Sequence, residues 1–289
     1  MSIKDNKRFA QLKVAPGEYV PDMGMDYPED DPYARLVPVH KVRDVKFDES
    51  YPFHESGFKF GIQRFAAYVI IWIPVYLINK FRYGMKVKGR GVLIRNFRSF
   101  RKGIVSVSNH CYRYDGAAVA HALMHRLWIP MLADHFEGES WWFLKYFGGI
   151  PLPDGSLSAT KKFNESFDLH HAAKGWVHVF PEARSWLFYK PLRPWRKGAF
   201  SMAYKWNAPV LPVALSFRPR TGIYKLFEKP EVPLVTVNIG DPIFPDQSVP
   251  RKVEVDRLMH EAFTQVCRLG GIEVNSWPVV WNENQSSNI

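Results

Sequence analysis

The sequence predicts an α/β fold in which a central mixed sheet is flanked by helices, with an N-terminal membrane-interacting helical segment. From residue 85 onward, short apolar runs alternate with helix-forming stretches, which is the pattern of an α/β domain. Before that point lies an uncharged and almost uniformly apolar stretch, residues 65–78. The chain has 289 residues, of which 46% are hydrophobic, so it can bury a sizeable core.

The N-terminal residues 1–55 are rich in proline, aspartate and lysine and show little apolar periodicity. We expect them to form an arm that is extended over the domain or partly disordered. Nothing at the start of the sequence resembles a secretory signal, because no apolar region follows the first charged residues.

Residues 56–84 are predicted to be the membrane-interacting helical segment. Its apolar part, residues 65–78, would rise only about 21 Å as a helix, against a hydrocarbon layer of roughly 30 Å. Pro74 would also bend it. These features favour an interfacial or re-entrant helix over a full span, and a buried core helix is the alternative.

The remaining elements follow from short apolar runs and helical periodicity between residues 85 and 275, which we expect to form one α/β domain. The tail, residues 276–289, is expected to be polar. Strands are expected over 85–88, 104–107, 129–132, 176–180, 210–215 and 234–239. Helices are expected over 117–127, 141–146, 158–174, 198–206 and 253–269, the last with a core-facing apolar stripe.

The composition restricts the function classes. A formal net charge of +11, from 39 basic and 28 acidic residues, implies anionic partners. Ten Trp, 13 Tyr and 21 Phe favour a water–lipid boundary among these, and no nucleic-acid-binding motif is present, so no nucleic acid partner is expected. Cys111 and Cys267 lie far apart without Cys-x-x-Cys spacing, which indicates neither a disulfide framework nor a zinc site and fits a reducing, cytoplasmic-facing setting.

A candidate catalytic base lies in residues 108–116, Ser-Asn-His-Cys-Tyr-Arg-Tyr-Asp-Gly, on the turn between a predicted strand and a helix. Within one helix His110 and Asp115 would point about 140° apart, but across a strand–turn–helix junction they can meet. A carboxylate on one ring nitrogen would fix the imidazole tautomer and leave the other to accept a hydroxyl proton. Backbone amides near the helix start would serve as oxyanion donors. A Cys111 thiol nucleophile is the weaker alternative.

Several blocks in order resemble the 1-acyl-glycerol-3-phosphate acyltransferase and lysophospholipid acyltransferase family of the glycerolphosphate acyltransferase superfamily. The His-x-x-x-x-Asp spacing after Asn109 resembles its first motif. Residues 148–153, Gly-Gly-Ile-Pro-Leu-Pro, occupy the place of the second. Residues 180–185, Phe-Pro-Glu-Ala-Arg-Ser, resemble its Phe-Pro-Glu-Gly-x-Arg-Ser block, and residues 195–200 and 208–213 resemble the basic and proline-containing stretches that follow.

The sequence departs from the family pattern at positions that affect the pocket. Ala183 replaces a glycine, and no residue separates it from Arg184. Asp154 follows the second block where the family often has an arginine. Tyr112 and Gly116 stand where a small hydroxyl residue and a proline are common.

The resemblance implies a membrane-associated O-acyltransferase on the cytoplasmic face. Its catalytic dyad would be His110 and Asp115, with no covalent acyl-enzyme and no bound cofactor or metal. Asn109, Glu182, Arg184 and Lys197 would bind substrate, although a local ion pair between Glu182 and Arg184, or a solvated basic surface around Lys197, is the alternative.

The implied partners are membrane lipids, a lysophospholipid acceptor and an acyl thioester donor, either acyl-CoA or acyl-carrier protein (acyl-ACP). The leading acceptor is 1-acyl-glycerol-3-phosphate, which would give phosphatidic acid. The alternatives are another lysophospholipid, transacylation, a non-glycerolipid hydroxyl, or a non-catalytic basic membrane-binding module.

Overall fold

A seven-stranded sheet organises the computed structural model, which describes residues 7–281. All neighbouring strands are parallel except β7 and β8, which pair antiparallel, so the sheet is mixed, as predicted. The strand order is β2 (Lys86–Lys88), β8 (Leu234–Ile239), β7 (Val210–Arg218), β3 (Val105–Ser108), β6 (Trp176–Val179), β4 (Leu127–Met131), β5 (Gly149–Pro151). The central strand β3 is buried along its whole length, which explains its lack of polar alternation.

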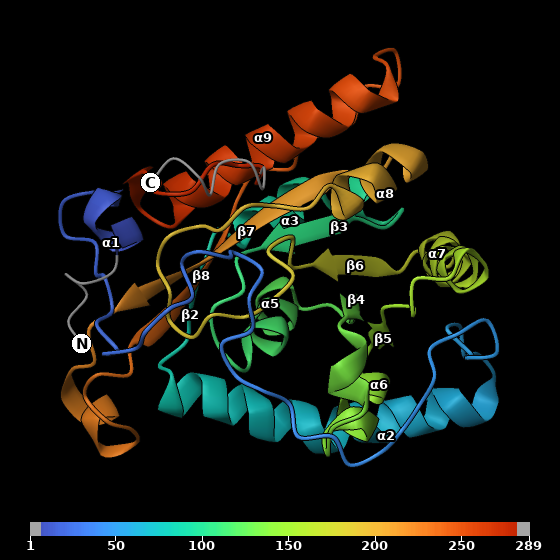
Figure 1. Ribbon diagram of the computed structural model, residues 1–289, viewed down its shortest axis with the longest axis horizontal. Coiled ribbons are helices and arrows are strands. Elements are labelled where there is room, and N and C mark those ends of the chain that lie inside the picture. Colours follow the sequence, from blue (N-terminus) through green and yellow to red (C-terminus); the bar gives the residue numbers. More distant parts are fainter. Residues whose placement is uncertain (1–6, 282–289) are drawn as a thin grey trace.

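Helices cover both faces of the sheet (Figure 1). One face carries α5 (Asp115–Leu123), and α2 (Phe58–Leu77) and α6 (Trp141–Phe147) pack outside it. The other face carries α8 (Gly198–Trp206) and α9 (Arg251–Leu269), while α7 (Leu157–Ala172) packs near β6. The predicted apolar stripe of α9 is buried in this second core: Val255, Leu258, Met259, Ala262, Phe263 and Val266.

The predicted helices agree closely with the observed ones, and the differences have local causes. The helix expected over 117–127 is α5, which begins at Asp115 and ends at Leu123, because Met124 adopts a left-handed backbone conformation with φ 54°. The sequence missed the short helices α3 (Gly91–Arg95) and α4 (Phe97–Phe100) and the 3₁₀ turns η3 (Ala133–Phe136) and η4 (Gly222–Leu226). Elements of four or five residues are too short to show a period.

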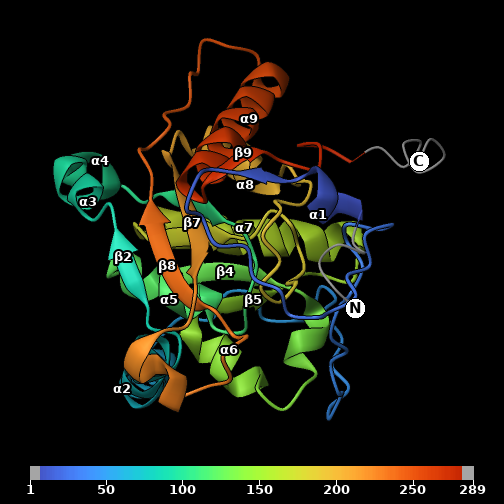
Figure 2. The ribbon, with the colours of Figure 1, turned by 90° about the vertical axis from the view of Figure 1, so that its left-hand side faces the viewer.

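The apolar N-terminal helix lies within the predicted helical segment, residues 56–84, and extends beyond its uncharged part, residues 65–78. It runs from Phe58 to Leu77, with Pro74 inside it, and continues as the π-helical turn η2 (Ile78–Arg82). Within α2 only Val75 is buried, so α2 is a surface helix and not the buried core helix that the sequence left open. It lies along the flank of the domain beside α5 and α6 (Figures 1 and 2).

By length and composition, the stretch Phe58–Arg82 is the one helix among residues 7–281 that is long and apolar enough to cross a membrane. Its mean hydropathy is 1.5, and 6% of the apolar window is buried.

The described part of the N-terminal arm, from residue 7, runs over the domain. Its helix α1 (Lys7–Gln11) is followed by β1 (Lys13–Val14), which pairs antiparallel with β9 (Ile272–Val274) near the other end of the chain. Trp277 is buried against Trp186 and Tyr189, so part of the predicted polar tail belongs to the body. The rest of that tail, residues 282–289, and arm residues 1–6 lie outside the described residues.

Candidate active site

The candidate site forms where two neighbouring parallel strands end. β3 pairs with β6, and Val107 lies opposite Val179. His110 follows β3 by two residues, and Glu182 follows β6 by three. The two turns therefore meet at the same edge of the sheet, where α/β domains commonly place their sites.

His110 and Asp115 are brought into direct contact. His110 Nδ1 lies 2.6 Å from Asp115 Oδ2, on the first residue of α5. The carboxylate also accepts the amides of Cys111, at 2.9 Å, Tyr112, at 3.3 Å, and Gly116, at 2.8 Å. Asp115 Oδ2 is thereby held in place to accept a hydrogen bond from Nδ1. Nε2 then carries the lone pair and is the group able to accept a proton.

The imidazole is partly exposed, whereas its carboxylate partner is buried. The His110 side chain is 21% exposed and that of Asp115 is 4% exposed. The ring of Phe180 stacks on the imidazole, with ring centroids 4.1 Å apart and planes inclined by 18°. The ring is therefore fixed on one face and by its Nδ1 bond, and the pair is preorganised for proton transfer.

Asn109 lies buried under the turn, where it contacts the neighbouring strand. Its Nδ2 donates to the carbonyl of Leu215 at 3.0 Å, and its Oδ1 accepts the amide of Leu215 at 2.8 Å. The side chain thus continues the ladder of β7 beyond the end of β3. The sequence predicted that Asn109 binds substrate. In the structure both polar atoms of its side chain instead hold the turn that carries His110.

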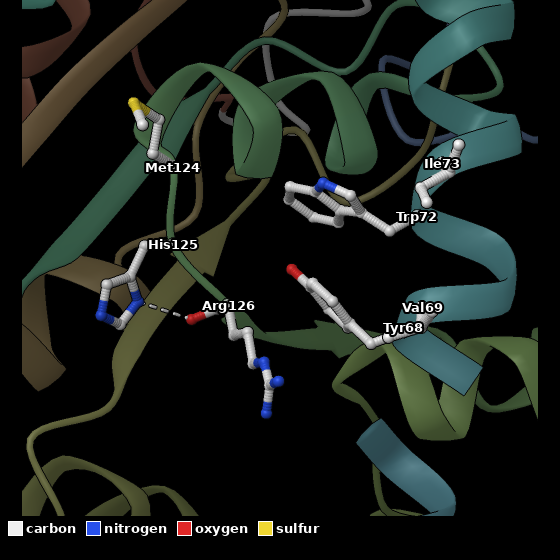
Figure 3. A pocket seen from close by; sticks show the side chains of 7 residues that line it. All are labelled: Tyr68, Val69, Trp72, Ile73, Met124, His125 and Arg126. Atoms are coloured by element: carbon white, nitrogen blue, oxygen red, sulfur yellow. Dashed lines mark hydrogen bonds between the residues drawn. The ribbon is translucent and has the colours of Figure 1, made fainter. Parts of the chain in front are cut away.

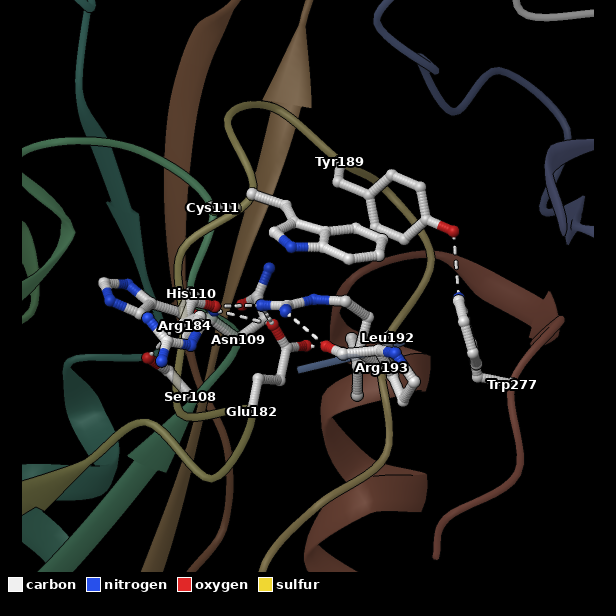
Figure 4. A network of polar contacts seen from close by, with 12 residues as sticks. Ser108, Asn109, His110, Cys111, Glu182, Arg184, Tyr189, Leu192, Arg193 and Trp277 are labelled. Carbon is white, nitrogen blue, oxygen red and sulfur yellow. Dashed lines mark hydrogen bonds and ion pairs between the residues drawn. The ribbon is translucent and has the colours of Figure 1, made fainter. Parts of the chain in front are cut away.

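Glu182 is held by Arg193 in a buried ion pair (Figure 4). Arg193 Nη2 donates to Glu182 Oε2 at 2.8 Å, and both side chains are at most 3% exposed. Glu182 Oε2 also accepts the amide of His110 at 3.3 Å, and Oε1 accepts that of Arg193. Burial raises the pKa of Glu182, and the Arg193 guanidinium opposes this shift. The carboxylate therefore connects the turn after β3 with the turn after β6. Its partner, Arg193, lies nine positions beyond Arg184, which the sequence offered as an alternative ion-pair partner.

Arg193 is a residue of the candidate site that the sequence analysis did not single out. It is completely buried, with its guanidinium 4.5 Å from the Trp186 ring centroid. It donates to the carbonyls of Arg184 and of Pro32 in the N-terminal arm, the latter at 2.8 Å. Trp186 Nε1 likewise donates to the carbonyl of Ala34 at 2.9 Å. The arm is thereby attached directly over the candidate site.

Arg184 stands among other cations close to His110. Its Nη1 is buried and finds no hydrogen-bond acceptor within residues 7–281. The pKa of His135 is lowered to about 4 by burial and then by the positive charges of His110, Arg35 and Arg184. Arg35, from the arm, forms an ion pair with Asp134. This group of basic side chains provides an electropositive environment suited to an anionic substrate group.

Lys197 lies at the start of α8, on the other face of the sheet. Its ammonium pairs with Asp256 of α9 at 2.5 Å. The structure therefore brings His110, Asp115, Asn109, Glu182 and Arg184 together and places Lys197 in a partly exposed contact between two helices.

The geometry of the turn bears on two further sequence-based expectations, a Cys111 nucleophile and oxyanion donors among the backbone amides. Cys111 is buried, and burial followed by the charge of Asp115 raises the pKa of its thiol, so it is a poor nucleophile. The amides of His110, Cys111, Tyr112 and Gly116 are engaged by Glu182 and Asp115. These four amides are consequently occupied and do not serve as the oxyanion donors that the sequence placed there.

A side-chain contact connects the turn to the apolar helix. The hydroxyl of Tyr112 donates to Oδ1 of Asn79 at 3.1 Å, and both residues are fully buried. Asn79 belongs to the π-helical turn η2, which follows α2. The large tyrosine at this position therefore connects the turn that carries His110 to the end of α2.

We compared the chain with protein families, curated proteins and solved structures. A family model described as acyltransferase matches residues 86–216, a span that includes β3, β6 and the turns that carry His110 and Glu182. Among solved structures, the crystal structure of the 1-acyl-sn-glycerophosphate (LPA) acyltransferase PlsC from Thermotoga maritima matches at 17% sequence identity, over 72% of this chain and 88% of that chain, with a TM-score of 0.42. None of the curated proteins compared with it matches this chain. Residues 86–216 therefore match the acyltransferase family, which supports an acyltransferase.

Proposed function

We propose that this enzyme transfers a fatty acyl group from acyl-CoA or acyl-ACP to the free hydroxyl of a lysophospholipid, with His110 and Asp115 as its catalytic dyad. The observation that carries the proposal is the 2.6 Å contact between Asp115 and His110 Nδ1, on a ring whose other nitrogen is available. The leading acceptor is 1-acyl-glycerol-3-phosphate, by resemblance of the ordered sequence blocks, and the product would be phosphatidic acid.

The chemistry needs no covalent acyl-enzyme. The acceptor hydroxyl attacks the thioester carbonyl while His110 Nε2 takes its proton, and Asp115 stabilises the imidazolium that forms. Collapse of the tetrahedral intermediate breaks the carbon–sulfur bond, and the imidazolium returns the proton to the leaving thiolate. The base is regenerated, and ester and free thiol are released.

The basic group around Arg184 supports an acceptor with a phosphate. Arg184 has a buried donor without an acceptor, and its planar fork suits a phosphate monoester. Arg35 and His135 lie close enough to Arg184 and His110 to influence the local charge. We infer that the phosphate binds on the Arg184 side of the imidazole.

The apolar helix supports a membrane location, which we propose to be the cytoplasmic surface. Large apolar side chains of α2 and η2 are exposed, among them Phe58 at 86%, Ile70 at 68% and Ile73 at 55%. Their side of the molecule also carries exposed Leu226 of η4 and Phe227, whose ring lies 6.2 Å from that of Phe81. Because α2 packs lengthwise on α5 and α6, we propose that it lies in the interface plane instead of crossing the bilayer.

A different acceptor is the second candidate. It is favoured by Asp154, an exposed acidic residue that follows the second sequence block where the family often has an arginine. The same dyad would then acylate another lysophospholipid or a non-glycerolipid hydroxyl.

The test is acyl transfer by purified protein in mixed micelles, with 1-acyl-glycerol-3-phosphate and 1-acyl-glycerophosphocholine as parallel acceptors and acyl-CoA and acyl-ACP as donors. His110→Ala should lower the rate by roughly 10²–10⁴-fold. Equal product from wild type and His110→Ala would refute the dyad and favour a non-catalytic membrane-binding role for this turn. A preference for the choline acceptor would refute the proposed acceptor while leaving the dyad intact.

A further inference from the structure

An open groove lies between α2 and the segment that joins α5 to β4, away from the catalytic centre (Figure 3). Its volume is about 370 Å³. Its lining residues come from one face of α2 and from three consecutive residues after α5: Tyr68, Val69, Trp72, Ile73, Met124, His125 and Arg126. Asp115 begins α5 and Met124 follows its last residue, so the groove lies about 13 Å along the helix from the dyad.

Two arginines near this groove lack carboxylate partners. The Arg126 guanidinium is exposed and lies 4.9 Å from the Tyr68 ring centroid, and Arg64 stacks on Trp128 at 3.7 Å. Neither arginine forms an ion pair with any side chain of residues 7–281. Burial, followed by the charge of Arg126, lowers the pKa of Arg64 to about 10. Two adjacent cations without a counter-charge destabilise each other, and an anion would relieve this repulsion.

The same cluster contains buried donors without acceptors. Within the described chain, the hydroxyl of Tyr68 and both Nε and Nη2 of Arg64 have no hydrogen-bond partner. Buried polar atoms in native proteins are nearly always paired, so the unpaired Tyr68 hydroxyl, which lines the groove beside Arg126, favours a ligand that brings an oxygen acceptor. The ligand would carry negative charge and several oxygen atoms.

The rest of the groove is apolar and continues onto the exposed face of α2. Val69 is 47% exposed, Ile73 55% and Met124 73%. A small inorganic anion would leave these side chains in water. A ligand that joins a phosphate to a hydrocarbon chain would satisfy both the arginines and the apolar wall.

We propose that this groove binds one anionic phospholipid of the bilayer, with the phosphate at Arg126 and Tyr68 and an acyl chain along Val69, Ile73 and Met124. The bound lipid is a ligand and not a substrate, because the site lies at the opposite end of α5 from His110. It anchors α2 in the interface and makes membrane attachment selective for anionic lipid.

The experiment compares binding of the full-length protein to phosphatidylcholine vesicles with and without phosphatidylglycerol, which is not a lysophospholipid acceptor. Arg126→Gln should weaken binding to the anionic vesicles about tenfold through loss of a charge-assisted contact. The matched control is Arg101→Gln, which removes the same charge from an exposed arginine that lies 5.8 Å from an aromatic ring, that of Phe97. The control should bind as wild type does.

A phosphatidylglycerol with a photoreactive acyl chain should label peptides that contain Val69, Ile73 or Met124, in the His110→Ala protein as well as in wild type. Equal weakening by Arg126→Gln and Arg101→Gln would overturn the proposal, because it would indicate general surface charge. Labelling elsewhere, or displacement of the lipid by inorganic phosphate alone, would also overturn it. The binding result does not depend on turnover, so failure of the proposed acyl transfer and failure of this proposal are distinguishable.

Discussion

Replacing Arg193 by methionine tests whether the buried ion pair with Glu182 supports the catalytic turns. Methionine keeps an unbranched apolar stem but removes the guanidinium, which pairs with Glu182 at 2.8 Å and donates to the carbonyls of Pro32 and Arg184. The Glu182 carboxylate, 2% exposed, then loses its counter-charge. An uncompensated buried charge of this kind costs about 3–5 kcal/mol.

The expected change in melting temperature follows from the length of the chain. For 289 residues the unfolding entropy is about 0.6 kcal/mol per degree. A loss of about 3–5 kcal/mol in the free energy of unfolding therefore corresponds to a decrease of about 5–8 °C in melting temperature. Lys205→Met is the matched control, because it breaks a partly exposed pair with Asp168. That surface pair contributes at most about 1 kcal/mol to stability, so the melting temperature of the Lys205→Met protein should fall by less than about 2 °C.

The assay is thermal unfolding of the purified protein in detergent, with the Glu182→Gln and the double variant measured in parallel. The melting temperature of the Arg193→Met/Glu182→Gln double variant should fall by less than the sum of the decreases in the two single variants, since the double variant leaves neither charge unpaired. An Arg193→Met protein that melts within about 1 °C of wild type would refute the reasoning.

The pH dependence of the Arg193→Met variant gives a second measurement. Without the cation, burial raises the pKa of Glu182 further above its usual 4.5. A carboxyl group with a higher pKa in the folded chain binds more protons when folded, so its contribution to stability is lost as pH rises through that pKa. The stability that Arg193→Met loses relative to wild type should therefore be larger at about pH 8 than at about pH 5.

The other predictions concern the dyad, a buried histidine, the strained turn and the apolar helix. Asp115→Asn should lower kcat roughly 10²–10⁴-fold in the acyl-transfer assay, because the amide no longer fixes the imidazole tautomer. Burial lowers the pKa of His178 from 6.5 to about 3, so its contribution to stability is lost as pH falls from 6.5, and His178→Asn should flatten the acid-side fall in melting temperature. Ala183→Gly should raise the melting temperature by about 1 °C, because Ala183 has φ 65°. Ile70→Glu should weaken vesicle binding at least about tenfold, whereas Leu157→Glu, on the exposed surface of α7, should not.

The sequence could predict the contact between His110 and Asp115 because its geometry is local. His110 and Asp115 are five residues apart, and the strand–turn–helix pattern around them was readable from apolar runs. The conformation of Ala183 is also local: its φ of 65° is one that glycine adopts without strain, which explains the family's glycine at this position. Short-range sequence patterns therefore predict the contact between His110 and Asp115 and also identify Ala183 as a departure from the family pattern.

The partners of Glu182 and Asn109 could not be predicted because they depend on the order of strands. The backbone that pairs with Asn109 belongs to Leu215, 106 residues away, and is adjacent only because β7 lies beside β3. Arg193 lies in an irregular segment, with no periodicity to show that it would be buried. Its contact with Pro32 also requires the arm to cross the site, 161 residues away in sequence. A charged residue in a loop is assigned to the surface by default, and here the default was wrong.

The uncharged stretch 65–78 does not mark the full length of α2, for a related reason. A count of uncharged residues ends the helix at Arg64, but in the structure that guanidinium lies on the ring of Trp128, and α2 extends six residues further toward its N-terminus. At the other end, the π-helical turn directs Asn79 inward to the Tyr112 hydroxyl. The end of α2 is therefore connected to the turn that carries His110 by this buried hydrogen bond and by the Tyr83 ring, which packs against Tyr112. The proposed membrane-binding helix and the proposed catalytic base thus contact each other through Tyr112, and attachment to lipid and orientation of the imidazole should change together when Asn79 is replaced.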